Sequence, residues 1–251
     1  MRCLLTTTQK KTHNRNIMST QQLTLNINLR DGLRFNSYYT EDKSPNAQVI
    51  RILQSFVSSK TPQQNILWGA QHSGKTHLLQ ACCSQATEDN FSASYIPLET
   101  FKSQGIDILS GLSQSQLLVL DDIDCVIGNK EWEIALFNLI NNTREKHQRL
   151  LMSSTENPRK LNCIYPDLAS RLIWGGSYQL QTLTDKDKPK ALQARAEQRG
   201  FELSDRVIDY LYRRYPRDIE SLMTILDQLD KESLRQKTVI TVPFVKQVLE
   251  K

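Results

Sequence analysis

The sequence predicts an α/β fold with a parallel sheet of five strands flanked by helices, followed by a small domain made only of helices. Strand-sized apolar runs alternate with segments of helical periodicity as far as residue 183, and only helical patterns follow. The octapeptide 69–76, entered directly from an apolar run, has the spacing of a phosphate-binding loop. Strands that alternate with helices are typical of a parallel sheet covered on both faces. The sequence therefore indicates a nucleotide-binding domain at 31–183 and a helical domain at 184–251.

Length, charge and cysteine spacing narrow the class of protein. The 251 residues suffice for one large domain, or for a medium-sized one with a small one. The net charge is +5, but residues 1–17 hold four basic residues and no acid, so the remainder carries no basic footprint for DNA. No apolar run reaches membrane-spanning length. The five cysteines lack paired or metal-ligand spacing, which indicates reduced packing residues in the cytoplasm.

Residues 1–30 are expected to form a flexible N-terminal segment. Residues 1–17 are polar and aperiodic. The stretch 22–29 then alternates apolar and polar side chains, a pattern typical of a half-buried strand. The same pattern fits an extended peptide at 22–27 whose apolar side chains fill pockets on a partner. The residues alone leave both interpretations open.

The elements of the sheet domain follow in order along the chain. The spacing of Val49, Leu53 and Phe56 predicts a helix from 45 to 57, which leads to the first strand. The phosphate loop then opens a helix from residue 77. Strands are predicted at 65–69, 92–98, 117–121, 149–154 and 177–182, and two further helices at 131–146 and 166–173.

Four residues of the octapeptide carry its chemistry. Gly69 and Gly74 allow the backbone to turn around a phosphate so that its N–H groups point inward. Lys75 can reach the terminal phosphates, and the Thr76 hydroxyl is a ligand for the Mg²⁺ that bridges them. The sequence predicts that ADP or ATP binds here with Mg²⁺, and it leaves the resident nucleotide open.

A pair of acids, Asp121 and Asp122, ends the apolar strand at 117–121. A parallel strand places its last residue at the carboxyl edge of the sheet, beside the phosphate loop. We expect Asp121 to hold Mg²⁺ together with Thr76, and Asp122 to polarise an attacking water. An acidic turn after a core strand is the alternative. Because Asp is one methylene shorter than Glu, hydrolysis by this chain alone is expected to be slow.

The helical domain at 184–251 begins with a conflict between two signals. Thr184 and Asp187 have the spacing of a capping box, but Pro189 would remove a backbone hydrogen bond from a helix that begins at Thr184. A kink or a delayed start is expected there. Further helices are predicted from Ser204 to Tyr212, from Asp218 to Leu234, and from Val242 onward.

Two arginines are candidates for contact with the terminal phosphate of a nucleotide. Arg171 lies in a short helix, where it is either a surface residue paired with Asp167 or a finger that enters a neighbour's site. Arg217 lies at the start of a helix, where it either neighbours Asp218 as an ordinary turn residue or contacts the chain's own nucleotide. The sequence pattern does not decide between these roles.

Taken together, these motifs resemble the AAA+ ATPases of the DnaA clade, and within it the small DnaA-related regulators of bacterial replication initiation. The similarity extends from Gln22 to the C-terminus. Its most specific parts are the stretch 166–172 followed by Trp174, and the closing stretch 240–246. The resemblance implies an AAA+ phosphate-loop NTPase fold with a helical lid.

The resemblance also implies roles for individual residues. Arg171 is similar to the family's arginine finger, and Arg217 to its second sensor. Four residues are similar to the family's peptide for the DNA polymerase III sliding clamp, the beta subunit: Gln22, Leu23, Leu25 and Ile27. The implied function is a clamp-tethered, ADP-bound inhibitor of DNA replication initiation that stimulates hydrolysis of the ATP on DnaA, with weak or no ATPase turnover of its own. Sequence-specific DNA binding is not expected, because no helix-turn-helix region follows the lid. The number of copies, including a homo-oligomer, stays open.

Three residues depart from the family's pattern, one of them Pro189, which interrupts the first lid helix as described above. Asn26 stands where the clamp peptide usually has proline, and Thr155 stands where an acidic or amide sensor is common. Two alternative functions stay open: a stand-alone AAA+ ATPase or helicase-loader motor, and a small-molecule kinase. The kinase would leave the helical domain and the Arg171 helix without a role.

Overall fold

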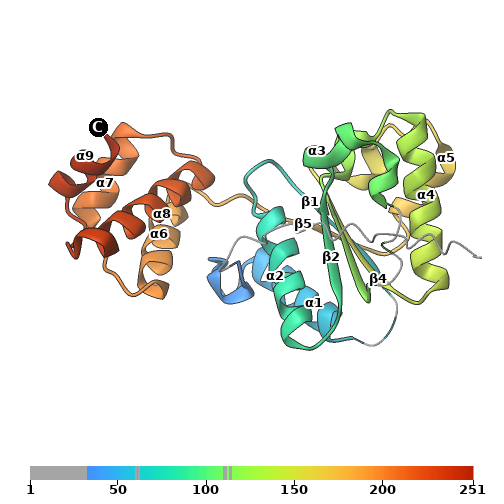
Figure 1. Ribbon diagram of the computed structural model, residues 1–251, viewed down its shortest axis with the longest axis horizontal. Coiled ribbons are helices and arrows are strands. Elements are labelled where there is room, and N and C mark those ends of the chain that lie inside the picture. Colours follow the sequence, from blue (N-terminus) through green and yellow to red (C-terminus); the bar gives the residue numbers. More distant parts are fainter. Residues whose placement is uncertain (1–32, 60, 62, 110–111, 113–114, 251) are drawn as a thin grey trace, which may run out of the picture.

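The fold was taken from a computed structural model, which describes residues 33–250 except 60, 62, 110, 111, 113 and 114. The predicted clamp peptide at 22–27 and the extension at 1–17 therefore lie outside the described residues. Two groups of elements are visible, a sheet domain and a helical lid, joined by the segment that follows the last strand (Figure 1). Among the described residues, no helix is both long enough and apolar enough to cross a membrane.

The sheet contains five parallel strands, which confirms the predicted fold class. The strands are β1 (Gln64–Trp68), β2 (Ala93–Pro97), β3 (Leu117–Asp121), β4 (Arg149–Ser154) and β5 (Gly176–Gln179). Their spatial order is β2-β3-β4-β1-β5, so β4 lies between β1, which precedes the phosphate loop, and β3, which ends at Asp121 directly before Asp122. Asn65 of β1 is in register with Leu151 of β4 and with Gly176 of β5.

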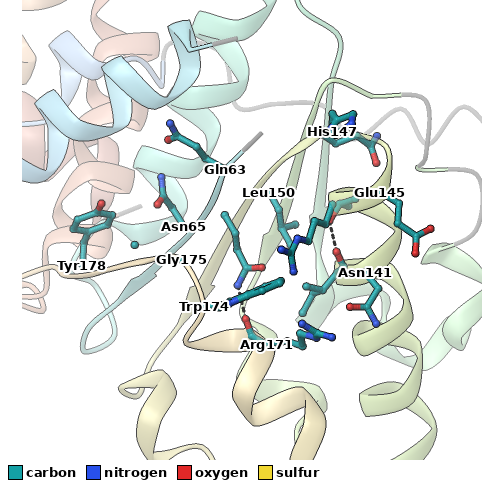
Figure 2. A pocket seen from close by; sticks show the side chains of 16 residues that line it. Gln63, Asn65, Asn141, Glu145, His147, Leu150, Arg171, Trp174, Gly175 and Tyr178 are labelled. Atoms are coloured by element: carbon teal, nitrogen blue, oxygen red, sulfur yellow. Dashed lines mark hydrogen bonds between the residues drawn. The ribbon is translucent and has the colours of Figure 1, made fainter. Parts of the chain in front are cut away.

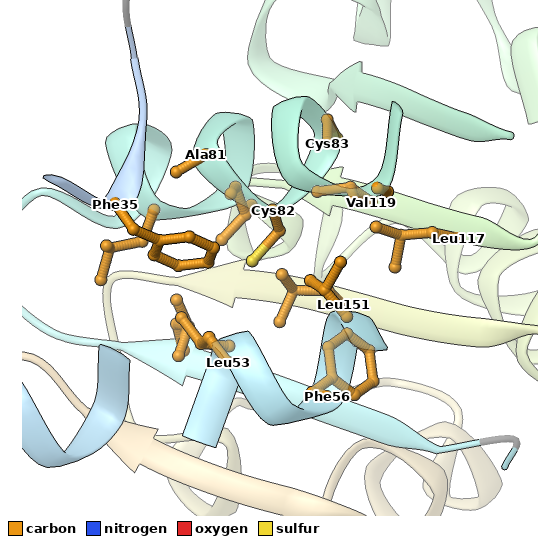
Figure 3. Close-up of a cluster of buried hydrophobic side chains, with 14 of the residues drawn as sticks. Phe35, Leu53, Phe56, Ala81, Cys82, Cys83, Leu117, Val119 and Leu151 are labelled. Carbon is orange, nitrogen blue, oxygen red and sulfur yellow. The ribbon is translucent and has the colours of Figure 1, made fainter. Parts of the chain in front are cut away.

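Helices cover both faces of the sheet, as alternation predicted. The helices are α1 (Pro45–Ser58), α2 (Lys75–Glu88), α3 (Leu98–Phe101), α4 (Lys130–Glu145) and α5 (Pro166–Leu172). Short 3-10 turns are η1 (Phe35–Ser37), η2 (Lys102–Gln104), η3 (Ile106–Leu109), η5 (Ile123–Val126) and η6 (Pro158–Lys160). Side chains of α1 and α2, such as Leu53 and Cys82, pack with Leu151 in one core cluster (Figure 3). A second cluster joins α4 and α5 to the sheet through Leu136 and Leu168.

The lid has an apolar core of its own. Its helices are α6 (Asp187–Gln198), α7 (Asp205–Arg214), α8 (Ile219–Gln236) and α9 (Val242–Leu249). Leu192, Leu211 and Leu226 are fully buried within a cluster that draws all its buried members from residues 192–248. Because the lid helices bury their apolar sides in one shared cluster, the lid needs no strand to complete its core.

At the start of α6, Pro189 and Thr184 do not have the roles that an uninterrupted helix from Thr184 would give them. Helix α6 begins at Asp187, so Pro189 lies in the first turn, where its missing N–H costs no helical hydrogen bond. This is the delayed start, not the kink. The Thr184 hydroxyl donates to the Asp187 carboxylate at 2.5 Å instead of capping a backbone N–H, because Lys186 is the residue that precedes the helix.

Candidate nucleotide-binding site

The phosphate loop connects the end of β1 to the start of α2, and its two glycines are fixed by close contacts. A Cβ on Gly69 would collide with the carbonyl oxygen of Leu180. Gly74 precedes α2 with a φ of 89°, in the left-handed region, and a Cβ there would lie 2.5 Å from the Tyr38 ring. The backbone therefore requires glycine at both positions, on steric grounds that the spacing of the motif alone does not reveal.

The Lys75 ammonium and the Ser73 hydroxyl line the loop as hydrogen-bond donors for a ligand. Lys75 is 6% exposed, and its Nζ donates to the carbonyl oxygens of Gly69 at 2.9 Å and Ala70 at 3.1 Å. Burial lowers the pKa of Lys75, and the nearby acids partly offset this decrease. The Ser73 hydroxyl is buried and has no hydrogen-bond partner among the described residues. Within the described part of the chain, this buried ammonium donates to carbonyls alone and lies beside an unpartnered hydroxyl, a donor set that suits the phosphates of a nucleotide.

The two predicted acids occupy the carboxyl edge of the sheet as expected. Asp121 is 1% exposed, and its carboxylate accepts hydrogen bonds from the hydroxyls of Tyr95, at 2.7 Å, and Ser153. Asp122 follows in a left-handed conformation, and burial, with added repulsion from Asp121 and Asp124, raises its pKa to about 6. Both carboxylates act electrostatically on Lys75, so the sheet brings these groups together across β4.

This arrangement fits Mg²⁺ as the predicted third component. Thr76 lies in the first turn of α2 with an exposed side chain, on the helix end that follows Lys75. Asp121 supplies the fixed carboxylate, held by two hydroxyls. Hydroxyl and carboxylate oxygens are the ligands that Mg²⁺ prefers, together with phosphate and water. The residues therefore fit a nucleotide with its magnesium ion.

The start of α8 in the lid lies against the phosphate loop. The ring Nδ1 of His72 lies 2.9 Å from the Glu220 carboxylate. Asp218 accepts a hydrogen bond from the backbone N–H of Ser221 at 2.8 Å, which lowers its pKa, with a smaller contribution from His72. Arg217 directly precedes this turn. Its side chain is exposed, and its Nε donates to the carbonyl oxygen of Tyr212 at 3.1 Å.

Arg171 lies elsewhere, in the last turn of α5 beside the amino ends of the strands. It lines a cavity of about 1110 Å³ with residues of α4 and with the starts of β1, β4 and β5 (Figure 2). Gln64 begins β1 and donates to the Arg171 carbonyl at 2.7 Å, whereas the phosphate loop follows the other end of that strand. Gln64 and Gly69, the first residue of the loop, are five residue steps apart, which corresponds to about 17 Å of extended strand. This separation exceeds the length of an arginine side chain, so Arg171 does not reach the chain's own phosphate loop.

Comparison with known sequence families decides the relationship. Residues 44–179 match the family described as the bacterial DnaA ATPase domain, and residues 185–249 match the family described as Hda, lid domain. The first match alone covers more than half of the chain. The chain belongs to the bacterial DnaA ATPase family. Its lid is of the Hda type, which identifies a DnaA-related AAA+ protein and confirms the resemblance seen in the motifs.

Solved structures share this fold. Domain III of DnaA from Thermotoga maritima superposes with a TM-score of 0.70 at 18% identity, over 87% of this chain and 95% of that one. AMPPCP-bound DnaA from Aquifex aeolicus gives a TM-score of 0.65 at 22% identity, over 83% and 69%. The Aeropyrum pernix ORC1 protein in complex with DNA gives 0.62 at 14% identity, over 88% and 67%. At these identities the comparison describes the fold only.

Three residues near the DnaA-type site were not predicted. The Tyr38 hydroxyl donates to the Ser73 carbonyl at 2.9 Å, and burial raises its pKa to about 12. Asn46 donates to the Tyr38 hydroxyl at 3.0 Å and exchanges two hydrogen bonds with the backbone of Gln181, at 2.8 and 2.9 Å. Tyr38 and the first turn of α1 therefore link the phosphate loop to the start of the lid connection.

The third residue that was not predicted is Asp124, whose carboxylate binds Thr155. Both the backbone N–H of Thr155, at 3.1 Å, and its hydroxyl donate to the Asp124 carboxylate. The hydroxyl proton of Thr155 is thus already committed within this chain. The sequence contains one feature that could have indicated this role: Asp124 is a third acid, two residues after Asp122, next to the pair of acids already identified as functional.

Proposed function

We propose that this protein is a negative regulator of replication initiation that binds a nucleotide in its own phosphate loop and supplies Arg171 to the ATP site of DnaA. The observation that carries the proposal is the position of Arg171, at the end of the sheet opposite to the chain's own phosphate loop. A guanidinium placed there serves a second molecule or no nucleotide at all. Membership in the DnaA ATPase family and the Hda-type lid support DnaA as that second molecule, since AAA+ domains commonly associate with others of their kind.

The surroundings of the Arg171 guanidinium support the same role. Its side chain is partly exposed, and no carboxylate forms an ion pair with it within the described part of the chain. An uncompensated guanidinium with a free fork of N–H donors is suited to the charge that develops on a transferring phosphoryl group. Supplied in trans, such a group accelerates hydrolysis by roughly 10³–10⁵.

The chain's own nucleotide is proposed to be ADP or ATP with Mg²⁺, held for structure more than for turnover. Asp122 is a short acid in a left-handed turn, and the Thr155 hydroxyl is engaged by Asp124. Neither feature favours accurate placement of an attacking water. Arg217 is proposed to contact the terminal phosphate when its side chain leaves the Tyr212 carbonyl.

The peptide at 22–27 is proposed to tether the protein to the sliding clamp. Its apolar side chains would each contribute roughly 1.5–3 kcal/mol on burial, much of it offset by association and ordering costs. A tether of that strength gains from a second contact, and a DNA-loaded clamp with bound DnaA nearby would provide it. We expect Gln22→Ala with Leu25→Ala to lower retention on immobilised clamp, and unchanged retention would return the segment to the strand interpretation.

The test is a reconstitution with clamp on DNA, ATP-bound DnaA and this chain, in which conversion to ADP is followed with single components omitted. Arg171→Ala is expected to abolish stimulation while clamp retention stays intact. Arg51→Ala, an exposed arginine on α1, is the matched control and is expected to stimulate normally. Normal stimulation by Arg171→Ala would overturn the assignment.

A second candidate function is a stand-alone ATPase or loader-type motor. It is favoured by the presence, in this chain's own site, of the lysine and both acids expected for hydrolysis: Lys75, Asp121 and Asp122. The discriminating measurement is turnover by the purified chain without DnaA. Many rounds of hydrolysis at ordinary ATPase rates, about 1 s⁻¹ or faster, would favour the motor.

A further inference from the structure

The side chain of Trp174 lies between two arginines. The guanidinium carbon of Arg144 lies over the indole at 3.4 Å from the ring centroid, and that of Arg171 lies over it at 4.7 Å. A guanidinium at 3.4 Å is in stacking contact and covers the face on which it lies. A second guanidinium at 4.7 Å over that same face would overlap the first, so the two arginines lie on opposite faces of the indole. Figure 2 shows Trp174 beside Arg171 among the residues that line the cavity.

Aromatic contacts, and not acids, hold these two charges. Neither Arg144 nor Arg171 forms an ion pair with any of the residues that the structure describes. The Arg171 guanidinium also lies 5.6 Å from the ring of Phe137. A ring face attracts a guanidinium without occupying its N–H donors. Arg171 therefore has a preferred position, while no residue that the structure describes accepts a hydrogen bond from its guanidinium.

The backbone on both sides of Trp174 is fixed to β1. The Arg171 carbonyl accepts from the Gln64 side chain at 2.7 Å and from the Trp174 N–H at 3.3 Å. On the other side, a Cβ on Gly175 would collide with the Gln64 carbonyl. The glycine allows β5 to approach β1 at this point. The indole is thus placed by the sheet, although its side chain is 48% exposed.

From this geometry we infer that Trp174 is a positioning residue for Arg171, with Arg144 fixing the indole from the opposite face. The inference rests on the proposed function of Arg171. The indole selects, from the many rotamers of a long side chain, the one that presents the guanidinium at the surface toward a partner's nucleotide. A cation–π contact at an exposed site favours the stacked position by about two- to five-fold in population.

The experiment compares Trp174→Leu with Trp174→Phe in the reconstituted clamp–DnaA reaction. Leucine retains apolar bulk without a ring face, whereas phenylalanine retains the ring face. We expect Trp174→Leu to lower the maximal stimulated rate about two- to five-fold with an unchanged half-saturating concentration, and Trp174→Phe to restore most of the rate. Arg144→Ala is expected to give a smaller loss. In an Arg171→Ala background, Trp174→Leu is expected to have no additional effect.

A second readout separates failure of this inference from failure of the proposed function. In NMR spectra, the side-chain protons of Arg171 should be shifted upfield by the indole ring current, and Trp174→Leu should abolish that shift. An unchanged resonance, an unchanged rate or a faster rate in Trp174→Leu would overturn the positioning role while Arg171→Ala stays impaired. If Arg171→Ala stimulates normally, the proposed function fails and the catalytic role of the stack fails with it, although the resonance still reports the contact itself.

Discussion

Asp122 is predicted to destabilise the nucleotide-free protein at neutral pH, and its replacement by asparagine should reveal the effect. Burial and the neighbouring acids raise the pKa of this carboxyl from 3.8 to about 6. The charged form is therefore less favourable in the folded protein than in the unfolded chain. A rise of about two pH units corresponds to at most about 3 kcal/mol of lost stability once both states are ionised. Because the side chain is only half buried, solvent screening reduces this to about 1–2 kcal/mol.

The sign of the pH dependence follows from the raised pKa. Below about pH 4 the carboxyl is protonated in both states and makes no contribution. As the pH rises through 6, the penalty develops fully, so Asp122→Asn should be more stable than the wild type at pH 7.5 by about 1–2 kcal/mol. The advantage should shrink as the pH falls toward 4. Nucleotide and Mg²⁺ should reduce it, because Mg²⁺ offsets the repulsion among the acids.

Urea unfolding followed by tryptophan fluorescence measures this effect in the correct domain. The three tryptophans, Trp68, Trp132 and Trp174, all lie in the sheet domain. The variant and the wild type are compared at pH 7.5 and pH 4.5 without nucleotide. Equal stability at pH 7.5, or an advantage that grows toward acid, would refute the electrostatic account of the acid cluster.

Two further predictions concern the backbone around the site. Gly74→Ala and Gly128→Ala both place an alanine at a φ of 89°, a left-handed strain of about 1–2 kcal/mol each. Of the two, position 74 faces the Tyr38 ring. Gly74→Ala should therefore lower the melting temperature more than Gly128→Ala and should also weaken nucleotide binding. Equal effects in thermal melts and nucleotide titrations would show that the ring contact has no consequence. Asn46→Ala should cost about 1–2 kcal/mol because it removes partly buried hydrogen bonds to the Tyr38 hydroxyl and to the N–H and carbonyl of Gln181, and faster amide exchange at Gln181 should accompany the loss. Unchanged exchange there would contradict the role of Asn46 as the link to the lid.

The parts of the fold that depend on local pattern were predictable. The buried run at β3 and the helical spacing of α1 and α4 fix their elements through side chains within a few residues of each other. The strand β5 was predicted at 177–182 but is Gly176–Gln179, since its edge position and alternating exposure give it a weaker pattern. The strand order was not predicted, because periodicity contains no information on which strands are neighbours.

The site was predictable where its chemistry is contiguous in sequence and not where it is assembled over distance. Lys75 and Asp121 follow from the phosphate-loop motif and from a strand that ends in acids. Tyr38 and Asn46 act through contacts with residues 35 and 135 positions away, and no local pattern marks them. The left-handed turn at Asp122 is likewise not marked in the sequence, since only a small fraction of non-glycine residues adopt a positive φ, even though aspartate tolerates it better than most.

The central claim is that Arg171 acts on a nucleotide held by another molecule, and a single-turnover chase tests it most directly. In the first arm, labelled ATP is bound to DnaA before this chain is added. In the second arm, labelled ATP is bound to this chain before DnaA is added. Clamp on DNA and an excess of unlabelled ATP are then added in both arms. The account predicts rapid hydrolysis of the label on DnaA, slow hydrolysis of the label on this chain, and a loss of roughly 10³-fold or more in the first arm with Arg171→Ala. Rapid hydrolysis that Arg171→Ala leaves unchanged, or that consumes only the label on this chain, would contradict it.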